Sequence, residues 1–246
     1  RRVPKTRFNG AVSAHRVIGS IDMSLSDIKR IREAVPGATV NDVVLAICGG
    51  GLRSYLKSKY ELDDDSLIAM APVNLRTSED STAGGGNRVS ALFVPIGTDI
   101  KAPLERLQAV YAHTSTSKSA HSAMDAGSLN EYGKYVPAYT AAATSRFITE
   151  TAANAPVPPY NVSITNVPGP QHPLYFCGAP MRSAIGIGPI SQGMGLIFPV
   201  LSYCGNVTIS FTSCREILPD PEDFEARLAA AADALLGAAD SQQKQA

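Results

Sequence analysis

The chain has 246 residues, and its 22 Lys and Arg residues balance its 22 Asp and Glu residues. A content of 44% hydrophobic and 18% charged residues is typical of a globular protein, and zero net charge argues against nucleic acid as a partner. No apolar stretch reaches the roughly 20 residues of a membrane-spanning helix. The four cysteines favour reduced thiols, so we expect a cytoplasmic protein. Peripheral contact with the inner membrane or lipid inclusions stays open.

The first predicted helix has a clear beginning and a clear end. Ser24 caps it, Asp27 stands three residues later as in a capping box, and Pro36-Gly37 terminates it. We therefore expect a short helix between these signals.

A second, longer helix is predicted from a cap at Thr39 to about Lys59, with Asp42 near the positive end of the helix dipole. Apolar residues surround its first two turns, which predicts a buried helix. Gly49-Gly50-Gly51 lies inside it, and each glycine costs about 1 kcal/mol against Ala. Such a run predicts that another backbone or a ligand comes close, or that the helix breaks there.

The middle of the chain mixes both kinds of element. We expect strands over 67–75 and 88–97, separated by a glycine-rich loop at 77–87. Helices are predicted from Pro103 and, in an Ala-rich stretch, over about 129–153.

The last third is rich in predicted strands. The stretch 160–167 places Val162 and Ile164 on one face, and Ser163 and Thr165 on the other. An apolar strand follows over 194–203, and we expect a hairpin turn at Gly205-Asn206 before its partner strand.

A final helix is predicted to begin at Asp220-Pro221. Its apolar face carries four residues, which are Phe224, Leu228, Ala231 and Leu235. Together the elements predict the α/β class, as an α+β arrangement with a mixed sheet.

Several residue patterns that could indicate catalysis or metal binding do not predict a site. Cys48, Cys177, Cys204 and Cys214 form no CxxC pair and no metal-type spacing with histidine, so we expect reduced thiols and no metal site. His121 and Asp125 stand in a polar stretch that favours a solvated loop or helix end.

Two glycine motifs also fail as catalytic signals. The stretch 188–193 is one residue too long for a nucleophile elbow. Gly84-Gly85-Gly86 lacks the Lys-Ser/Thr of a phosphate-binding loop.

Two polar signatures remain. Asn41-Asp42 opens the apolar second helix, and a buried amide or carboxylate needs a partner, because an unpaired one costs about 1–3 kcal/mol. Either Asp42 caps its own helix and Asn41 ties down a neighbouring loop, or one of them faces a site beyond the helix. The second signature is 161–170, a strand with hydroxyl groups on one face that runs into a Pro-Gly-Pro turn.

These signatures carry a family resemblance. NDVVLA at 41–46 with TNVPGP at 165–170 resembles the C-terminal half of the bacterial wax ester synthase/diacylglycerol acyltransferases. The resemblance extends in order through RFNG at 7–10, APVNLR at 71–76, GNR at 86–88, PIS at 189–191 and MGL at 194–196.

The resemblance implies a fold similar to chloramphenicol acetyltransferase and nonribosomal condensation domains, with two α/β subdomains around a tunnel. Such enzymes transfer a fatty acyl group from acyl-CoA, which is a substrate and not a cofactor, to a long-chain alcohol or diacylglycerol. The general base of the family is the second His of an HHxxxDG motif. That motif is absent here, since none of the four histidines has a His neighbour. We therefore expect residues 1–246 to be the C-terminal subdomain, whose partner is the N-terminal half of the same enzyme.

The resemblance also assigns roles. Asn41 is the first candidate for a supporting polar contact at the reaction centre, and Asp42 orders the helix start and joins the substrate-binding residues. Ser163, Thr165 and Asn166 are candidates for donors near the thioester oxygen, where charge grows in the transition state. Candidates for shaping the acyl or alcohol channel are Ile185, Gly188, Met194 and Gly195. A non-catalytic lipid-binding or scaffolding module of the same fold is the alternative, and the preference between alcohol and diacylglycerol stays open.

Overall fold

The structure is a computed structural model that describes residues 2–74, 89–123 and 158–244. The elements in chain order are η1 (Arg7–Asn9), β1 (Arg16–Ser24), α1 (Leu25–Glu33), α2 (Val40–Ser58), β2 (Ile68–Asn74), β3 (Val89–Pro95), α3 (Pro103–Ala123), β4 (Val162–Val167), β5 (Tyr175–Phe176), β6 (Ala179–Pro180), β7 (Ile197–Tyr203), β8 (Asn206–Cys214) and α6 (Pro221–Gln243). The loop expected at 77–87 and the Ala-rich helix expected over 129–153 lie outside the described residues. The other expected helices and strands are confirmed.

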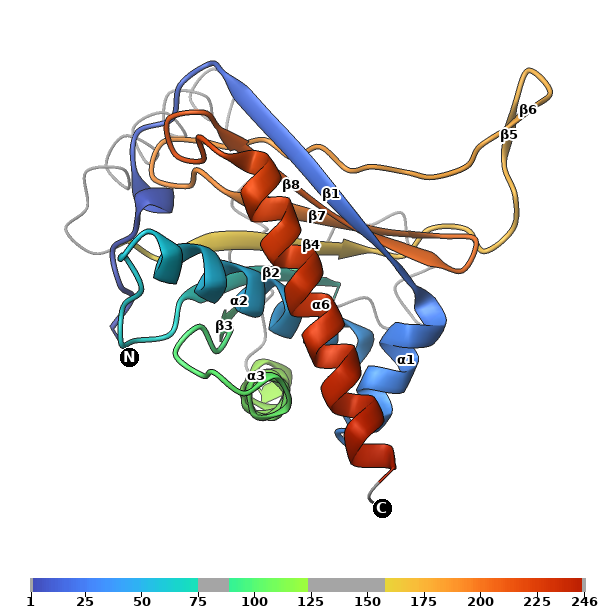
Figure 1. Cartoon of the computed structure of the whole chain (residues 1–246), viewed down its shortest axis with the longest axis horizontal. Coiled ribbons are helices and arrows are strands. Elements are labelled where there is room, and N and C mark those ends of the chain that lie inside the picture. Colours follow the sequence, from blue (N-terminus) through green and yellow to red (C-terminus); the bar gives the residue numbers. More distant parts are fainter. Residues whose placement is uncertain (1, 75–88, 124–157, 245–246) are drawn as a thin grey trace.

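Six strands form one mixed sheet in the order β1-β8-β7-β4-β2-β3. The central strand β4 runs parallel to β7 and β2, and the remaining pairs are antiparallel. Among the described residues, helices cover only one side of this sheet (Figure 1). The α/β class with a mixed sheet is thus confirmed.

Aromatic packing joins the helices to the sheet. The ring of Phe224 on α6 lies 4.9 Å from that of Phe211 on β8 and 6.0 Å from that of Phe198 on β7, centroid to centroid. On its other side it meets the ring of Tyr55 on α2 at 5.2 Å. All four residues are fully buried. Burying an aromatic side chain of this size stabilises a fold by about 1.5–3 kcal/mol, so this cluster holds α2 and α6 against the strands.

The predicted helix starts are confirmed at two places. The Ser24 hydroxyl accepts a hydrogen bond from the backbone N–H of Asp27 at 3.0 Å, and Thr39 forms a capping box with Asp42. At α6, Pro221 occupies the first turn as expected. The buried face of α6 contains Ala232 in place of the predicted Ala231. Residues four positions apart lie on the same face of a helix, and Ala232 is four positions after Leu228.

The hairpin turn lies one residue earlier than predicted. Cys204 and Gly205 form it, with φ angles of 45° and 83°, and Asn206 already pairs with Tyr203 as the first residue of β8. Positive φ at both central positions is the pattern of a type I′ turn, whose twist matches that of the flanking strands. Asn206 belongs to β8 because it also pairs with Ser24 on β1.

The glycine run inside α2 reflects close packing. A Cβ atom at Gly49 would overlap the backbone oxygen of Ile96, and one at Gly51 would lie 2.9 Å from a methyl carbon of Leu228 on α6. The helix continues unbroken through this region. Of the three outcomes that the sequence allowed, close approach of neighbouring groups is the observed one.

Two searches of the described residues bear on function. None of the helices described has the length and apolar character required to cross a membrane. In the same part of the chain, no three His, Cys, Asp or Glu side chains gather as a metal site would require. The four cysteines are free thiols, with Cys48 and Cys214 buried and Cys177 exposed.

Candidate functional site

The start of α2 is built around the Asp42 carboxylate, which is fully buried. Its Oδ2 accepts hydrogen bonds from the backbone N–H and the hydroxyl of Thr39, both at 2.7 Å, and its Oδ1 accepts one from the Thr114 hydroxyl on α3 at 2.7 Å. The carboxylate therefore closes the capping box and ties α2 to α3. Both oxygens are occupied, so this geometry favours the ordering role of Asp42, and its place among the substrate-binding residues stays a prediction.

Asn41 has a different environment from its neighbour. Its side chain is half-buried, and its amide makes no hydrogen bond with another described residue. The amide is therefore available for a ligand or for a further part of the protein, as the functional reading of this position requires.

The three polar candidates on β4 do not share one face. Ser163 stands opposite Ile197 and Thr165 opposite Pro199, whereas Asn166 stands opposite the fully buried Val200. Because successive side chains of a strand alternate between faces, Asn166 lies on the helix-covered side. Ser163 and Thr165 lie on the opposite side, which we call the open face of the sheet.

Apolar side chains are also exposed on the open face. Register places Ile18, Phe93 and Val167 there, and they are 43%, 52% and 51% exposed. These residues belong to β1, β3 and β4, so the exposed apolar groups are spread from one edge strand of the sheet to the other. The open face therefore presents exposed apolar side chains as well as the hydroxyl groups of β4.

The Pro-Gly-Pro turn after β4 packs tightly against the end of β7. The backbone N–H of Gly169 donates to the Ser202 hydroxyl at 3.1 Å, and that of Cys204 donates to the carbonyl of Pro170 at 3.2 Å. A Cβ atom at Gly169 would overlap the backbone oxygen of Ser202. Only glycine therefore allows the turn to come this close to β7.

The predicted channel residues lie in two places, two of them on the open face and two at the edge where β7 begins. Ile185 is 55% exposed. The backbone of Gly188 packs close to Ile197 of β7, and its N–H donates to the hydroxyl of Thr212 on β8 at 3.3 Å. Met194 and Gly195 lie at the other end, where β7 begins. There Met194 contacts the Tyr160 hydroxyl, and the Gly195 N–H donates to the carbonyl of Phe8 at 2.8 Å.

The candidates thus fall into three places. Ser163, Thr165, Ile185 and Gly188 belong to the open face, and Met194 with Gly195 to the edge where β4 begins. The third place is the helix-covered side, with Asn41, Asp42 and Asn166. In Figure 1 the first turn of α2 and the arrowhead of β4 point to the same side of the molecule. The structure therefore separates Asn41, Asp42 and Asn166 from the hydroxyl groups of β4, which lie on the other face of the sheet.

A buried amide pair was missed by the sequence reasoning, although both residues lie in the motifs. Asn161 is fully buried, and its Nδ2 donates to the carbonyl of Pro4 at 2.6 Å and to Oδ1 of Asn9 at 3.0 Å. Its Oδ1 accepts from the backbone N–H of Ile68 at 2.8 Å. The pair holds the N-terminal segment against the start of β4, which is a structural role. The available signal was the position of Asn161 directly before a predicted apolar strand, because an amide that is buried there must find hydrogen-bond partners.

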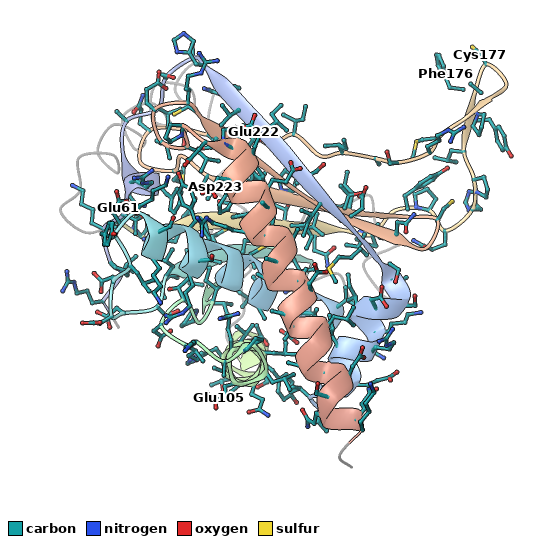
Figure 2. All side chains as sticks on the ribbon, in the orientation of Figure 1. Glu61, Glu105, Phe176, Cys177, Glu222 and Asp223 are labelled. Atoms are coloured by element: carbon teal, nitrogen blue, oxygen red, sulfur yellow. The ribbon has the colours of Figure 1, made fainter. Side chains whose placement is uncertain are left out.

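A short hairpin extends from the body of the molecule. Figure 2 shows Phe176 and Cys177 at the tip of the β5–β6 hairpin, away from the sheet. The side chains of Tyr175 and Phe176 are 67% and 83% exposed. Two exposed aromatic residues on such an arm are typical of a segment that contacts another part of a protein.

Comparison with known proteins gives a consistent result. A family model described as the WS/DGAT C-terminal domain matches residues 85–235. Two putative diacylglycerol O-acyltransferases of Mycobacterium tuberculosis are 34% identical over 224 residues and 31% identical over 217 residues. These matches cover 89% and 88% of this chain but only 43% and 42% of the relatives, so the chain spans less than half of their length.

Solved structures resemble the chain in the same way. A wax ester synthase/diacylglycerol acyltransferase from Marinobacter aquaeolei matches with a TM-score of 0.76 and 25% identity, over 96% of this chain and 52% of its own. The starter condensation domain of rhizomide synthetase matches with a TM-score of 0.52 and 12% identity, over 94% of this chain and 46% of its own. The second likeness concerns the fold alone, and it agrees with the fold expected from the sequence.

Proposed function

Because the chain belongs to the wax ester synthase/diacylglycerol acyltransferase family and contains its C-terminal domain, we propose that it is the C-terminal half of an acyl-CoA-dependent O-acyltransferase. The product is a wax ester when the acceptor is a long-chain alcohol, and a triacylglycerol when the acceptor is diacylglycerol. The observation that carries the proposal is the family match combined with relatives, named as acyltransferases, of which this chain spans less than half.

The open face supports a partner half. Ile18, Phe93 and Val167 expose apolar surface on a face that no described helix covers. Covering such side chains is favourable by about 25 cal/mol for each Å² removed from water. We infer that the N-terminal half packs on this face and places the HHxxxDG histidine within reach of β4.

The reaction needs one base and a group that stabilises an oxyanion. The base takes the proton of the acceptor hydroxyl, the oxygen attacks the thioester carbonyl, a C–O bond forms, and the C–S bond breaks as the CoA thiol leaves with a proton. In this proposal the base comes from the N-terminal half. Ser163 and Thr165 supply donors toward the carbonyl oxygen from the open face, and Asn41 and Asn166 supply amides from the edge.

No cofactor is required by this chemistry, and acyl-CoA enters as a substrate. The extended segment with Ile185 and Gly188 forms one wall of the acyl or alcohol channel, and Met194 and Gly195 line its end. Peripheral contact with a membrane or with lipid inclusions would bring the enzyme to its apolar acceptors.

The test is reconstitution from two halves. This chain is combined with the N-terminal half, supplied with palmitoyl-CoA and hexadecanol or diacylglycerol, and the release of CoA thiol is followed. We expect turnover with both halves and none with this chain alone. The control is an N-terminal half whose second HHxxxDG histidine is replaced by Ala.

Two results would contradict the proposal. Turnover by this chain alone, above that of a heat-killed sample, would place the base within it. Lipid binding without turnover by the reconstituted halves would favour the non-catalytic module.

A further inference from the structure

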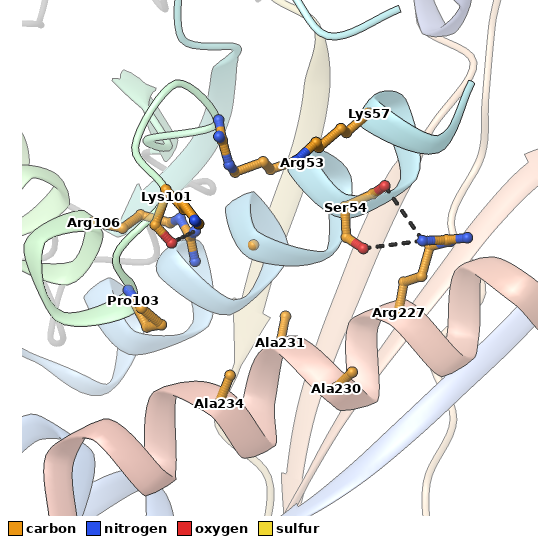
Figure 3. Close-up of a pocket in the computed structure, with 11 residues that line it drawn as sticks. Arg53, Ser54, Lys57, Lys101, Pro103, Arg106, Arg227, Ala230, Ala231 and Ala234 are labelled. Atoms are coloured by element: carbon orange, nitrogen blue, oxygen red, sulfur yellow. Dashed lines mark hydrogen bonds between the residues drawn. The ribbon is translucent and has the colours of Figure 1, made fainter. Parts of the chain in front are cut away.

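A pocket of about 240 Å³ lies on the helix-covered side of the molecule, between α2, the beginning of α3 and α6 (Figure 3). Its lining is strongly cationic. Five basic side chains contribute to it, and no acidic residue does; the basic residues are Arg53, Lys57, Lys101, Arg106 and Arg227. The remaining lining is mostly glycine and alanine, which leaves room between the helices.

Arg106 forms the base of this pocket. It is 4% exposed, its Nε donates to the carbonyl of Gly97 at 3.2 Å, and its Nη2 donates to the carbonyls of Ile100 and Lys101 at 2.8 and 3.2 Å. These acceptors are neutral, and no carboxylate oxygen of a described residue forms a salt bridge with the guanidinium. Asp99 attracts the guanidinium electrostatically without forming a salt bridge with it, but burial and the nearby Arg53 outweigh this attraction and lower the pKa of Arg106. A buried cation that is only partly compensated is costly.

One nitrogen of Arg106 is left for a ligand. Nη1 makes no hydrogen bond with a described residue, and it faces Gly50, where a Cβ atom would lie only 2.6 Å from it. Figure 3 shows the guanidinium pointing into the space between α2 and α6. Burial and the nearby Arg53 lower the pKa of Arg106 to about 10, so the group stays charged at neutral pH. The pocket thus has a charged, buried donor with free N–H groups at its base.

The other cations leave most of the positive charge uncompensated. Arg227 is paired with Asp223 at 2.8 Å, and Arg53 donates to the carbonyls of Thr98 and Asp99. Lys57 and Lys101 are exposed at the rim and form no salt bridge with a described residue. Like charges that are held together repel one another, and an anion of double charge would relieve this repulsion.

We propose that this pocket binds a phosphate group, with Arg106 at its base and Lys57 and Lys101 at its rim. Its volume of about 240 Å³ leaves room for a phosphate group, and its five basic side chains favour an anion over an apolar acyl chain. Lysine and arginine together are the usual partners of phosphate, because arginine presents N–H groups in a planar fork and lysine a compact charge. The group belongs either to a soluble phosphate ester or to a phospholipid headgroup. The inference stands on this geometry and does not rest on the proposed acyltransferase activity.

The test uses the full-length protein with three probes: inorganic phosphate, adenosine 3′,5′-bisphosphate, and vesicles of phosphatidylcholine with or without phosphatidic acid. Binding of the soluble probes is measured by calorimetry, and binding of vesicles by flotation, all at one low ionic strength, because salt screens exposed charges. The main variant is Lys57→Glu with Lys101→Glu, since both residues are exposed and the fold does not depend on them. Lys29→Glu on α1 is the matched control, because Lys29 is also exposed and lies outside the pocket.

We expect the double variant to lose at least about tenfold in affinity, or 1.4 kcal/mol, for at least one phosphate probe, and the control to change by less than twofold. Loss with soluble probes identifies a phosphate ester, and loss only with phosphatidic acid vesicles identifies a lipid headgroup. Gly50→Ala provides a second variant, because its Cβ would occupy the space at Nη1. Absence of binding by every probe, or equal losses in the double variant and the control, would overturn the inference.

Discussion

Replacing Asp42 with Ala tests whether the start of α2 is structural or chemical. The carboxylate is fully buried and accepts three hydrogen bonds, two from Thr39 and one from Thr114. The alanine variant removes all three. The Thr114 hydroxyl, which has a single proton, can then donate to the carbonyl of Tyr111, which lies 3.1 Å away. The main losses are therefore the capping box and the charged link to α3.

The magnitude follows from these contacts. Loss of a helix cap costs about 1 kcal/mol, and loss of a hydrogen bond to a charged group about 1.5–3 kcal/mol. We expect Asp42→Ala to lower the free energy of unfolding by about 3 kcal/mol. For a domain of this size, that corresponds to a fall in Tm of about 6–12 °C.

The assay compares thermal melting and kcat on one preparation of the complete enzyme. Asp27→Ala is the matched control, because Asp27 occupies the same position in α1 but its side chain is 32% exposed. We expect the control to lose about 1 kcal/mol or less. Equal falls in Tm for the two variants would refute this account of α2. A large loss of kcat at normal Tm would instead assign the Asp42 carboxylate to the reaction.

The remaining predictions concern single positions. Asn41→Ala is expected to lower kcat by about 10²–10³ with little change in Tm, and a fall in Tm at normal kcat would remove Asn41 from the site. Gly237→Ala is expected to stabilise α6 by about 0.5–1 kcal/mol, since nothing lies within 4 Å of the added Cβ. Gly49→Ala is expected to destabilise the protein, because its Cβ would overlap the backbone oxygen of Ile96. Urea unfolding that gave both changes the same sign would contradict this packing. Under native conditions a maleimide is expected to label the exposed Cys177 rapidly and to spare Cys48, whose pKa is raised by burial; mass spectrometry showing equal rates would count against the buried position of Cys48.

Local signals in the sequence were sufficient for most elements, whereas the strands β1, β5 and β6 were not predicted from them. Ser24, Thr39 and Pro221 mark helix starts because capping bonds and the fixed φ of proline act within one turn. The hairpin turn was displaced by one residue, since the choice between Gly205-Asn206 and Cys204-Gly205 depends on which residue pairs with the neighbouring strand. The prediction of Ala231 on the buried face of α6 was also wrong by one residue, because that face is set by how α6 packs on α2 and the sheet.

The candidate site was only partly accessible from the sequence. The motifs at 41–46 and 165–170 indicated the family, which the comparison confirmed. The assignment of Asn166 beside Ser163 and Thr165 overlooked that it lies on the opposite face of the sheet, which the alternation of side chains along one strand already predicts. The cationic pocket left no signal at all, because Arg53, Arg106 and Arg227 are far apart in the chain.

The sequence by itself therefore determined most of the helices and strands that the structure describes, the mixed α/β class and the family, because capping, periodicity and short motifs are local properties of the chain. The tertiary structure alone decided which side chains face one another. The order β1-β8-β7-β4-β2-β3 brings distant segments side by side, with the described helices packed on one face of the sheet. Strand register and helix packing depend on contacts between residues far apart in sequence, and no local pattern contains them.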